Sequence, residues 1–532
     1  MSLGAWNALS LKEKVGQLFI CGFDGRESSE GIRKLIEEYS LGGVIYFRRN
    51  LKDASQVEAL SKSLQERAKI PLFISIDQEG GMVVRLEEGV SVMPGAMAIG
   101  AAGRPDWAYE AAYLSGAELR EIGINMNFAP CLDVNNNPAN PVIGVRSYGE
   151  RPESVAALGV AALTGYQASG VAAVAKHFPG HGDTAADSHH ELPVVPHGRD
   201  RLDAVELLPF RSAISSGVDA IMTAHVVFPA YEPDGVPATL SRRILTGLLR
   251  EQLGYGGVIV TDCLEMNAIS ETIGVARGAV EAIKGGADLV LVSHRLDRQV
   301  AALEAVYDAV LAGEIPESRV NEAVERIWSL KHSRGLFESK LPAASDRKKA
   351  QETALRISES TVTVVKGHDF LPLSRSVNVL TVWAEARVGT EVVEVIEQHR
   401  TLGAALQDEG YSVTELRVGL TPDESEFEAA LAAADDKDAI LFASYDAGFS
   451  PPQSELIRRL AQLSDRPRVF GLIATRTPYD LLAVPDVPLY VCTYENKPTM
   501  MNALAGVLSG RIPAHGRLPV TIGSFPRYSS AP

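Results

Sequence analysis

Cysteine is scarce in this sequence, and its distribution argues against one kind of site. The chain of 532 residues has four cysteines, Cys21, Cys131, Cys263 and Cys492, which lie far apart and form no Cys-x-x-Cys pair. This usage fits a reducing compartment and does not indicate a structural zinc site. We expect all four to be small core residues.

Basic clusters and long apolar runs are also missing. With a formal net charge of -16, the chain repels phosphate backbones and anionic bilayers, so we expect no nucleic-acid partner and no membrane partner. No apolar run reaches membrane-spanning length. Near the N-terminus, Lys12, Glu13 and Lys14 stand where a signal peptide needs an unbroken apolar stretch, and we expect a cytoplasmic protein.

The first two thirds of the chain alternate short apolar runs with amphipathic stretches. Helical patterns such as 152–169 and 201–216 separate the runs. The runs are rich in β-branched or aromatic residues and lack polar alternation, which is typical of strands buried on both faces. They cover residues 17–23, 43–47, 72–77, 125–130, 171–177, 219–225, 257–262 and 288–294.

This alternation predicts an α/β fold with a closed (β/α)8 barrel, the TIM barrel. An open doubly wound sheet uses the same local pattern, but eight strands favour closure. The chain is too long for one ordinary core. We predict a catalytic barrel domain over 1–335, a polar linker over 336–354 and a smaller α/β sandwich domain over 355–532.

Polar residues follow the predicted strands, as catalytic groups do at the carboxyl end of such a barrel. The sharpest case is Asp262, which the apolar run "GVIVTD" delivers straight to this end; the alternative is a helix cap or a loop acid. The residues at or after strand ends are Asp77, Asp133, Lys176, His177, His225, Asp262 and His294.

One stretch, "KHFPGHGDTAADSHHELP" at 176–193, holds four histidines, two aspartates and a glutamate. A zinc site needs three or four ligands in tetrahedral geometry, often paired on a regular element. These histidines are spaced irregularly, with Pro179, Gly180 and Gly182 between them. We therefore expect no metal and no cofactor.

The same stretch suits acid/base chemistry better. Asp187 and His189 lie two residues apart, so in an extended turn their side chains share one side and the carboxylate can orient and charge the imidazole. A histidine with a pKa near its ordinary value of about 6.5 gives and takes a proton near neutral pH.

Taken together, the motifs "KHFPGHGDT", "DSH", "IDQEGGMVVRL" and "VIVTDCLEM" resemble those of the glycoside hydrolase family 3 β-N-acetylhexosaminidases, the NagZ-type enzymes. The resemblance runs from residue 10 to about residue 335. The region after 350 resembles, less strongly, the second α/β domain that many family 3 enzymes carry.

This resemblance implies a retaining, exo-acting glycosidase for terminal, non-reducing β-linked N-acetylglucosamine. Asp262 matches the nucleophile, His189 the general acid/base and Asp187 its orienting partner. His181 and Asp183 match positions that shape the catalytic loop. The positions that match sugar-binding residues are Asp77, Arg85, Arg146, Lys176 and His177. A retaining mechanism does require an ionised nucleophile and a separate proton donor.

Several alternatives stay open at this stage. A β-glucosidase of the same family takes its acid/base from the second domain and lacks the Asp-x-His motif, so "DSH" argues against it. A phosphorylase, in which phosphate replaces water, fits the same residues. A non-catalytic wall-sugar binding protein is disfavoured because Asp262, Asp187 and His189 are intact. We expect a monomer acting on a small carbohydrate, with a muropeptide in cell-wall recycling favoured over a chitin fragment or a glycolipid.

Overall fold

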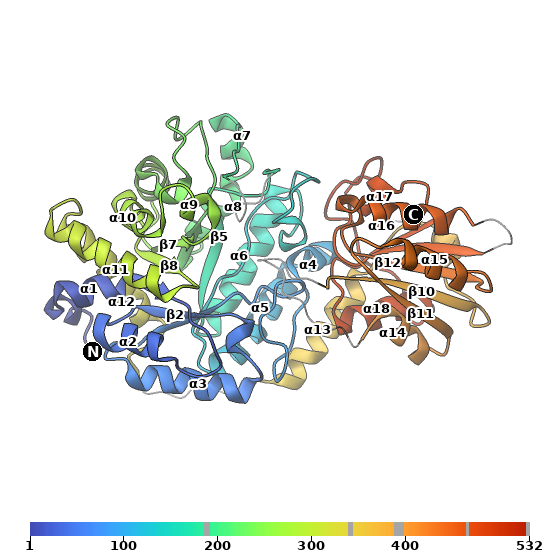
Figure 1. The fold of residues 1–532 in the computed structure, drawn as a ribbon, viewed down its shortest axis with the longest axis horizontal. Helices are drawn as coiled ribbons and strands as arrows, with labels where there is room; N and C mark the ends of the chain where they lie inside the picture. Colours follow the sequence, from blue (N-terminus) through green and yellow to red (C-terminus); the bar gives the residue numbers. More distant parts are fainter. Residues whose placement is uncertain (186–191, 339–343, 388–397, 399, 464–467, 528–532) are drawn as a thin grey trace.

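The computed structural model describes residues 1–532 except 186–191, 339–343, 388–397, 399, 464–467 and 528–532. The chain forms two α/β units that lie side by side (Figure 1). The first is a closed barrel of eight strands and the second is a six-stranded sheet with helices. The predicted fold class is therefore confirmed.

Eight parallel strands make the barrel, and each falls within one of the predicted apolar runs except that β5 and β7 extend one residue beyond theirs. Every strand pairs in parallel with the next, and β1 pairs with β8 through Phe19 and Val290, which closes the ring. This pairing decides between a barrel and an open sheet. The strands are β1 (Phe19–Cys21), β2 (Gly43–Tyr46), β3 (Phe73–Ile76), β4 (Met126–Asn127), β5 (Ala172–Phe178), β6 (Ala220–Thr223), β7 (Val258–Cys263) and β8 (Leu289–Val292).

Helices cover the outside of the barrel. The pattern at 152–169 forms α6, whereas the pattern at 201–216 forms two helices, α7 and α8, rather than one. Pro209 explains this difference, because it has no N–H to donate to the carbonyl of Val205 and fits only the first turn of a new helix. The α-helices are α1 (Leu11–Gln17), α2 (Glu30–Tyr39), α3 (Ala54–Arg67), α4 (Ala96–Ala102), α5 (Pro105–Glu121), α6 (Pro152–Ala168), α7 (Arg199–Ala204), α8 (Leu207–Ser215), α9 (Asn267–Ser270), α10 (Val275–Gly285), α11 (Leu296–Leu311) and α12 (Glu317–Ser333).

The second unit is built on a sheet of order β11-β10-β12-β13-β14-β9, in which β9 alone is antiparallel to its neighbour. In the predicted sandwich domain the apolar runs at 361–367, 377–385, 438–446, 468–475 and 487–495 each contain a strand, but β11 was not predicted. Its residues up to Arg417 are exposed or half-buried, because it lies at the edge of the sheet, and its last two, Val418 and Gly419, are buried. The strands are β9 (Thr363–Lys366), β10 (Asn378–Glu385), β11 (Ser412–Gly419), β12 (Ala439–Ser444), β13 (Val469–Ala474) and β14 (Leu489–Cys492), and the helices that pack on them include α14 (Leu402–Asp408), α15 (Glu424–Ala433), α16 (Pro451–Ala461), α17 (Asp480–Ala483) and α18 (Pro498–Leu508).

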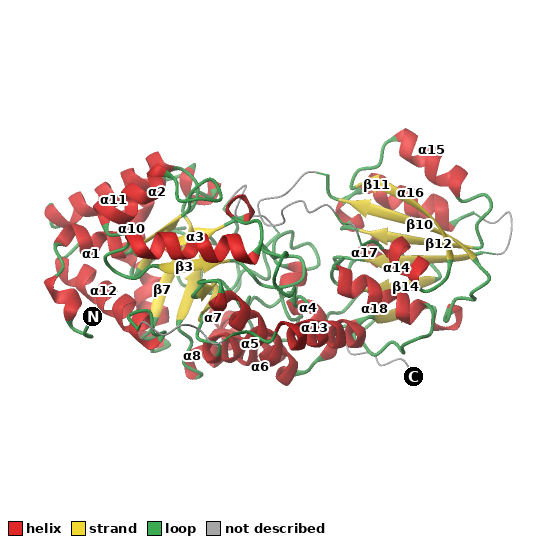
Figure 2. Ribbon diagram, turned by 90° about the horizontal axis from the view of Figure 1, so that it is seen from below, coloured by secondary structure: helices red, strands yellow, loops and turns green. Residues whose placement is uncertain are grey.

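Helix α13 (Arg347–Thr361) joins the two units, and Figure 2 shows it running between α5 and α18. Its apolar face, with Ala350, Ala354 and Ile357, packs into the barrel core. The first residues of α13 lie in the stretch predicted as a linker, so the domain boundaries at 335 and 355 remain predictions.

The cysteines behave as expected, since all four are buried and none forms a disulfide. No helix among the described residues is both long enough and apolar enough to cross a bilayer.

Candidate active site

A cavity of about 430 Å³ opens at the carboxyl ends of the barrel strands. It is lined by six of the predicted site residues, Asp77, Arg85, Arg146, Lys176, His177 and Asp262. Other polar groups in its wall are Arg49, Glu79, His181, Glu265 and His294. Asp187 and His189, the predicted acid/base pair, lie outside the described residues.

On one side of the cavity, two carboxylates and two cations form a buried network. The Nζ atom of Lys176 lies 2.6 Å from Asp77 Oδ1 and 2.7 Å from Glu79 Oε1. Arg146 donates to both oxygens of Glu79, through Nε at 3.0 Å and Nη2 at 2.8 Å. This bidentate pairing fixes the guanidinium plane as well as its charge.

The charges in this network stabilise one another. Burial alone would raise the pKa of Glu79, but Arg146 and Lys176 beside it hold that pKa well below its ordinary value. Burial alone would lower the pKa of Lys176, and the neighbouring carboxylates Asp77 and Glu79 raise it instead. The cavity therefore offers fixed carboxylate acceptors and cationic donors, the groups that recognise sugar hydroxyls.

Glu79 was missed by the sequence analysis. It lies two residues beyond the acid that follows β3, on a turn whose glycines Gly80 and Gly81 have positive φ angles. The Gly-Gly pair directly after an acidic residue was the available signal, because it marks a tight turn at a barrel strand end.

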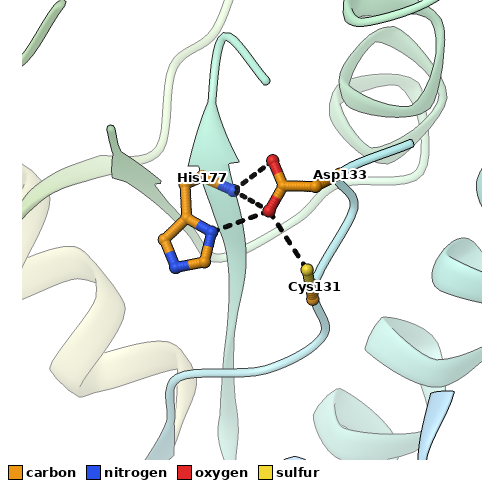
Figure 3. A group of neighbouring side chains, drawn as sticks. All are labelled: Cys131, Asp133 and His177. Carbon is orange, nitrogen blue, oxygen red and sulfur yellow. Dashed lines mark hydrogen bonds and ion pairs between the residues drawn. The ribbon is translucent and has the colours of Figure 1, made fainter. Parts of the chain in front are cut away.

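A second network orients His177 (Figure 3). The buried carboxylate of Asp133 lies 2.7 Å from His177 Nδ1 and accepts hydrogen bonds from the backbone N–H groups of His177 and His181. Burial would raise the pKa of Asp133, but His177 and His181 hold it well below its ordinary value. Asp133 accepts a hydrogen bond from the Nδ1–H group of His177. The other ring nitrogen, Nε2, therefore faces Arg146, whose Nη2 is 3.4 Å away.

Among the described residues, Cys131, Asp133 and His177 form a group whose ligand atoms lie within 4.8 Å of one another, close enough to share an ion. Their chemistry suits hydrogen bonding better. The thiol of Cys131 donates to Asp133 at 3.1 Å, and burial raises the pKa of that thiol well above its ordinary value. A metal ligand has to be a thiolate, so the donor set does not fit a cation well.

Removal of metal ions tests this interpretation. We expect exhaustive dialysis against EDTA to leave both the turnover rate and the melting temperature of the protein unchanged, because the Asp133 carboxylate is already saturated by N–H and S–H donors. If activity were lost in EDTA and restored by added zinc, this group or the 176–193 stretch would have to be a metal site.

Asp262 lies near the end of β7 and is half-buried in the cavity wall. Its Oδ1 accepts a hydrogen bond of 2.7 Å from the backbone N–H of Cys263. The next helix, α9, begins only at Asn267 and has Met266 at its N-cap position, so Asp262 is not a helix cap. One of the two alternative interpretations of this acid is thereby removed.

Two of the polar residues at or after strand ends do not line the cavity. His225 is fully buried, and its ring lies 2.8 Å from Thr239 Oγ1 and 2.9 Å from the carbonyl oxygen of Cys263. It thus holds the end of β7 in place through Cys263, the residue after Asp262. Asp133 acts through His177, as described above.

Asn140 holds the segment at His181 and Gly182, the described beginning of the predicted catalytic loop. Its Nδ2 donates to the carbonyl oxygens of His181 and Gly182, at 2.9 and 3.0 Å, while its Oδ1 accepts from the backbone N–H of Ile143 at 2.7 Å. Gly182 packs so tightly that a Cβ there would lie 1.9 Å from the carbonyl oxygen of Val134. Asp183 is not among the residues that line the cavity, and one of its oxygens lies 2.6 Å from His197 Nε2.

Comparison with known proteins places the barrel in a family. Residues 10–330 match the model for the glycosyl hydrolase family 3 N terminal domain. The β-hexosaminidase A of Pseudoalteromonas piscicida is 38% identical over 382 residues, which cover 66% of this chain and 63% of that protein. The β-N-acetylglucosaminidase/β-glucosidase of Cellulomonas fimi is 30% identical over 96% of this chain and 93% of its own length.

Among solved structures, a glycoside hydrolase family 3 β-N-acetylglucosaminidase from Paenibacillus sp. str. FPU-7 is 52% identical. It superposes with a TM-score of 0.94, and the match covers 97% of this chain and 99% of that one. The similarity therefore extends through both α/β units.

The fold and the cavity define a TIM-barrel enzyme with a carboxylate-rich site at the carboxyl end of its strands. The chain belongs to glycoside hydrolase family 3. The resemblance to the β-N-acetylhexosaminidases of this family, which the sequence motifs indicated, is confirmed.

Proposed function

We propose that the chain is a retaining, exo-acting β-N-acetylglucosaminidase that removes terminal, non-reducing β-linked N-acetylglucosamine. The observation that carries the proposal is the position of Asp262 in a cavity that also holds the Asp77, Glu79, Lys176 and Arg146 network. The activities named for the Paenibacillus and Pseudoalteromonas relatives support it.

In this proposal the carboxylate of Asp262 attacks the anomeric carbon and forms a covalent glycosyl ester. His189 donates a proton to the leaving oxygen in the first step and takes one from water in the second, and Asp187 orients and charges its ring. Lys176 and Arg146 line the same cavity as Asp262, and positive charge close to a carboxylate favours its ionised form.

In this proposal the buried network binds the sugar. Asp77, whose side chain is 17% exposed, accepts hydrogen bonds from hydroxyl groups, while Lys176, Arg146 and Arg85 donate. His177 presents Nε2 to the cavity because Asp133 holds the other side of its ring. These groups are held by one another before substrate arrives, so little reorganisation is needed on binding.

The same site has a second candidate activity, cleavage of β-glucosides, because the Cellulomonas fimi relative carries both activities in its name. We propose a muropeptide as the natural substrate, processed during cell-wall recycling. The cysteine usage supports a cytoplasmic enzyme, and we propose that it acts as a monomer.

The deciding assay compares matched substrates at one pH. We expect the chain to release the aryl group from an aryl β-N-acetylglucosaminide at a kcat/KM at least about tenfold higher than from the aryl β-glucoside, a difference of roughly 1.4 kcal/mol. A muropeptide and chitobiose are then compared as unactivated substrates, with and without phosphate. Equal rates on the two aryl glycosides would contradict the preference for N-acetylglucosamine, and accumulation of a sugar phosphate would identify a phosphorylase.

A further inference from the structure

One buried segment of the second α/β unit packs against the barrel, on the side of the active site. This segment, residues 493–497, follows β14 directly. Two of its charged side chains are almost fully buried: Glu495 is 1% exposed and Lys497 is 2% exposed. Both reach the barrel segment 78–95, which follows β3 and which we name the β3 turn.

Glu495 contacts the two ends of the β3 turn where they meet. Its Oε2 accepts a hydrogen bond of 2.7 Å from the backbone N–H of Gly95. Gly81 lies against the same oxygen, so that a Cβ at Gly81 would come within 2.6 Å of it and within 2.6 Å of Gly95 Cα. The N–H of Gly81 in turn donates to Met93 at 2.9 Å. Glu495 therefore closes a tightly packed junction that has no spare volume.

Lys497 contacts the middle of the β3 turn. Its Nζ lies 2.8 Å from Glu87 Oε1, and the same oxygen is 2.9 Å from Nη2 of Arg48. Arg48 Nη2 also donates to the carbonyl oxygen of Val84 at 3.0 Å. The second unit thus holds the β3 turn at two separated points.

The β3 turn also carries cavity groups to which we assign sugar binding. Gln78 ties the turn together, since its Oε1 accepts from the backbone N–H of Arg85 at 2.9 Å and its Nε2 donates to Leu86 at 2.7 Å. Glu79 and Arg85 both line the cavity, and Glu79 bonds Lys176 and Arg146. A shift of the β3 turn would therefore displace Glu79 and Arg85, and it would disturb the network to which we assign sugar binding.

The contact of Glu495 with Gly95 needs only an acceptor oxygen, which a glutamine would also offer. The Oε1 atom of Glu495 has no hydrogen-bond partner within the described part of the chain, and burial raises the pKa of this carboxyl to about 7. A buried carboxyl of this kind costs stability, so the stability of the second unit alone does not explain the contact with Gly95.

We propose that Glu495 and Lys497 are positioning residues, through which the second unit holds the β3 turn so that Glu79 and Arg85 meet the sugar. The expected fall in kcat/KM rests on the proposed function. The expected change in the β3 turn does not. This positioning role differs from catalysis by the second unit, because neither side chain lines the cavity.

The test uses the full chain with Glu495→Ala and Lys497→Met. A misplacement of about 1 Å in a binding site lowers the rate by up to 100-fold, so we expect kcat/KM on an aryl β-N-acetylglucosaminide to fall about 10- to 100-fold, mainly through KM. Glu495→Gln keeps the acceptor for Gly95 and should restore most of the loss. Amide hydrogen exchange in residues 79–95 should be faster in Glu495→Ala and unchanged in Glu495→Gln.

Asp480→Ala is the matched control. This carboxyl is also fully buried in the second unit, but it bonds Ser444 and Gly448 of its own unit and does not reach the barrel. We expect it to lower the melting temperature with KM and exchange in 79–95 unchanged. If Glu495→Ala behaves like Asp480→Ala, the inference is wrong. An inactive wild type would instead contradict the proposed function, and the exchange measurement would still decide the positional role.

Discussion

Replacing Asp262 with alanine is expected to lower kcat by roughly four powers of ten or more, on the scale seen when a catalytic nucleophile is removed. The physical reason is that the other described carboxylates of the cavity wall have partners of their own, Asp77 and Glu79 being paired with Lys176. Glu265, the nearest carboxyl along the chain, is committed to the backbone N–H groups of His294 and Arg295 at 2.6 and 3.2 Å, and burial raises its pKa. Steady-state kinetics with an aryl glycoside measure the loss.

Two further measurements bear on this prediction. Asp297→Ala, which changes an exposed acid paired with Arg295 on the surface, should leave turnover within about twofold of wild type, as surface substitutions generally do. A 2-fluoro sugar should become covalently attached to Asp262. Attachment to another residue, or near wild-type turnover in Asp262→Ala, would remove Asp262 from the nucleophile role.

Replacing His189 with alanine is expected to give a loss that depends on the leaving group. Protonation by a positioned acid typically contributes about 100- to 10,000-fold, and a very acidic phenol does not need it. An unactivated disaccharide should therefore be slowed far more than an aryl glycoside with such a phenol. Azide attacks without a base, so it should partly restore turnover when the second step is limiting.

The neighbouring loop residues supply the comparison for this second prediction. Asp187→Ala should show the same dependence in weaker form, because the imidazole remains but is less often charged and less well oriented. His190→Ala, which alters the adjacent histidine, should show no dependence on the leaving group. If His189→Ala slows both substrates equally and azide has no effect, His189 is a binding or structural residue and the acid/base has to be sought elsewhere.

Local patterns predicted the strands well because a strand buried on both faces needs an unbroken apolar run. All eight barrel strands match such runs to within one residue, and the polar residues at or after their ends include Asp77, Lys176 and Asp262 of the cavity. The same rule explains the failure at β11, since an edge strand needs no such run. It also explains the division of 201–216, where Pro209 interrupts an otherwise helical pattern.

The site was only partly predictable because its charges are paired over long distances in sequence. Lys176 meets Asp77 across 99 positions, and Arg146 meets Glu79 across 67. Nothing near Glu79 in the sequence shows that two cations will hold it ionised in a buried place. Asp133 was noted only as a polar residue after a strand, and its role in orienting His177 follows from the meeting of β5 with the segment after β4.

The sequence by itself determined the class of fold, the positions of the buried strands, the family and most of the polar residues of the cavity, because these depend on local periodicity and short motifs. Only the tertiary structure decided that β1 pairs with β8 to close the barrel, that Glu79 belongs to the buried network of the cavity, and that Glu495 and Lys497 lie against the β3 turn. These features require contacts between distant segments, and such contacts depend on how the whole chain packs rather than on any one stretch of it.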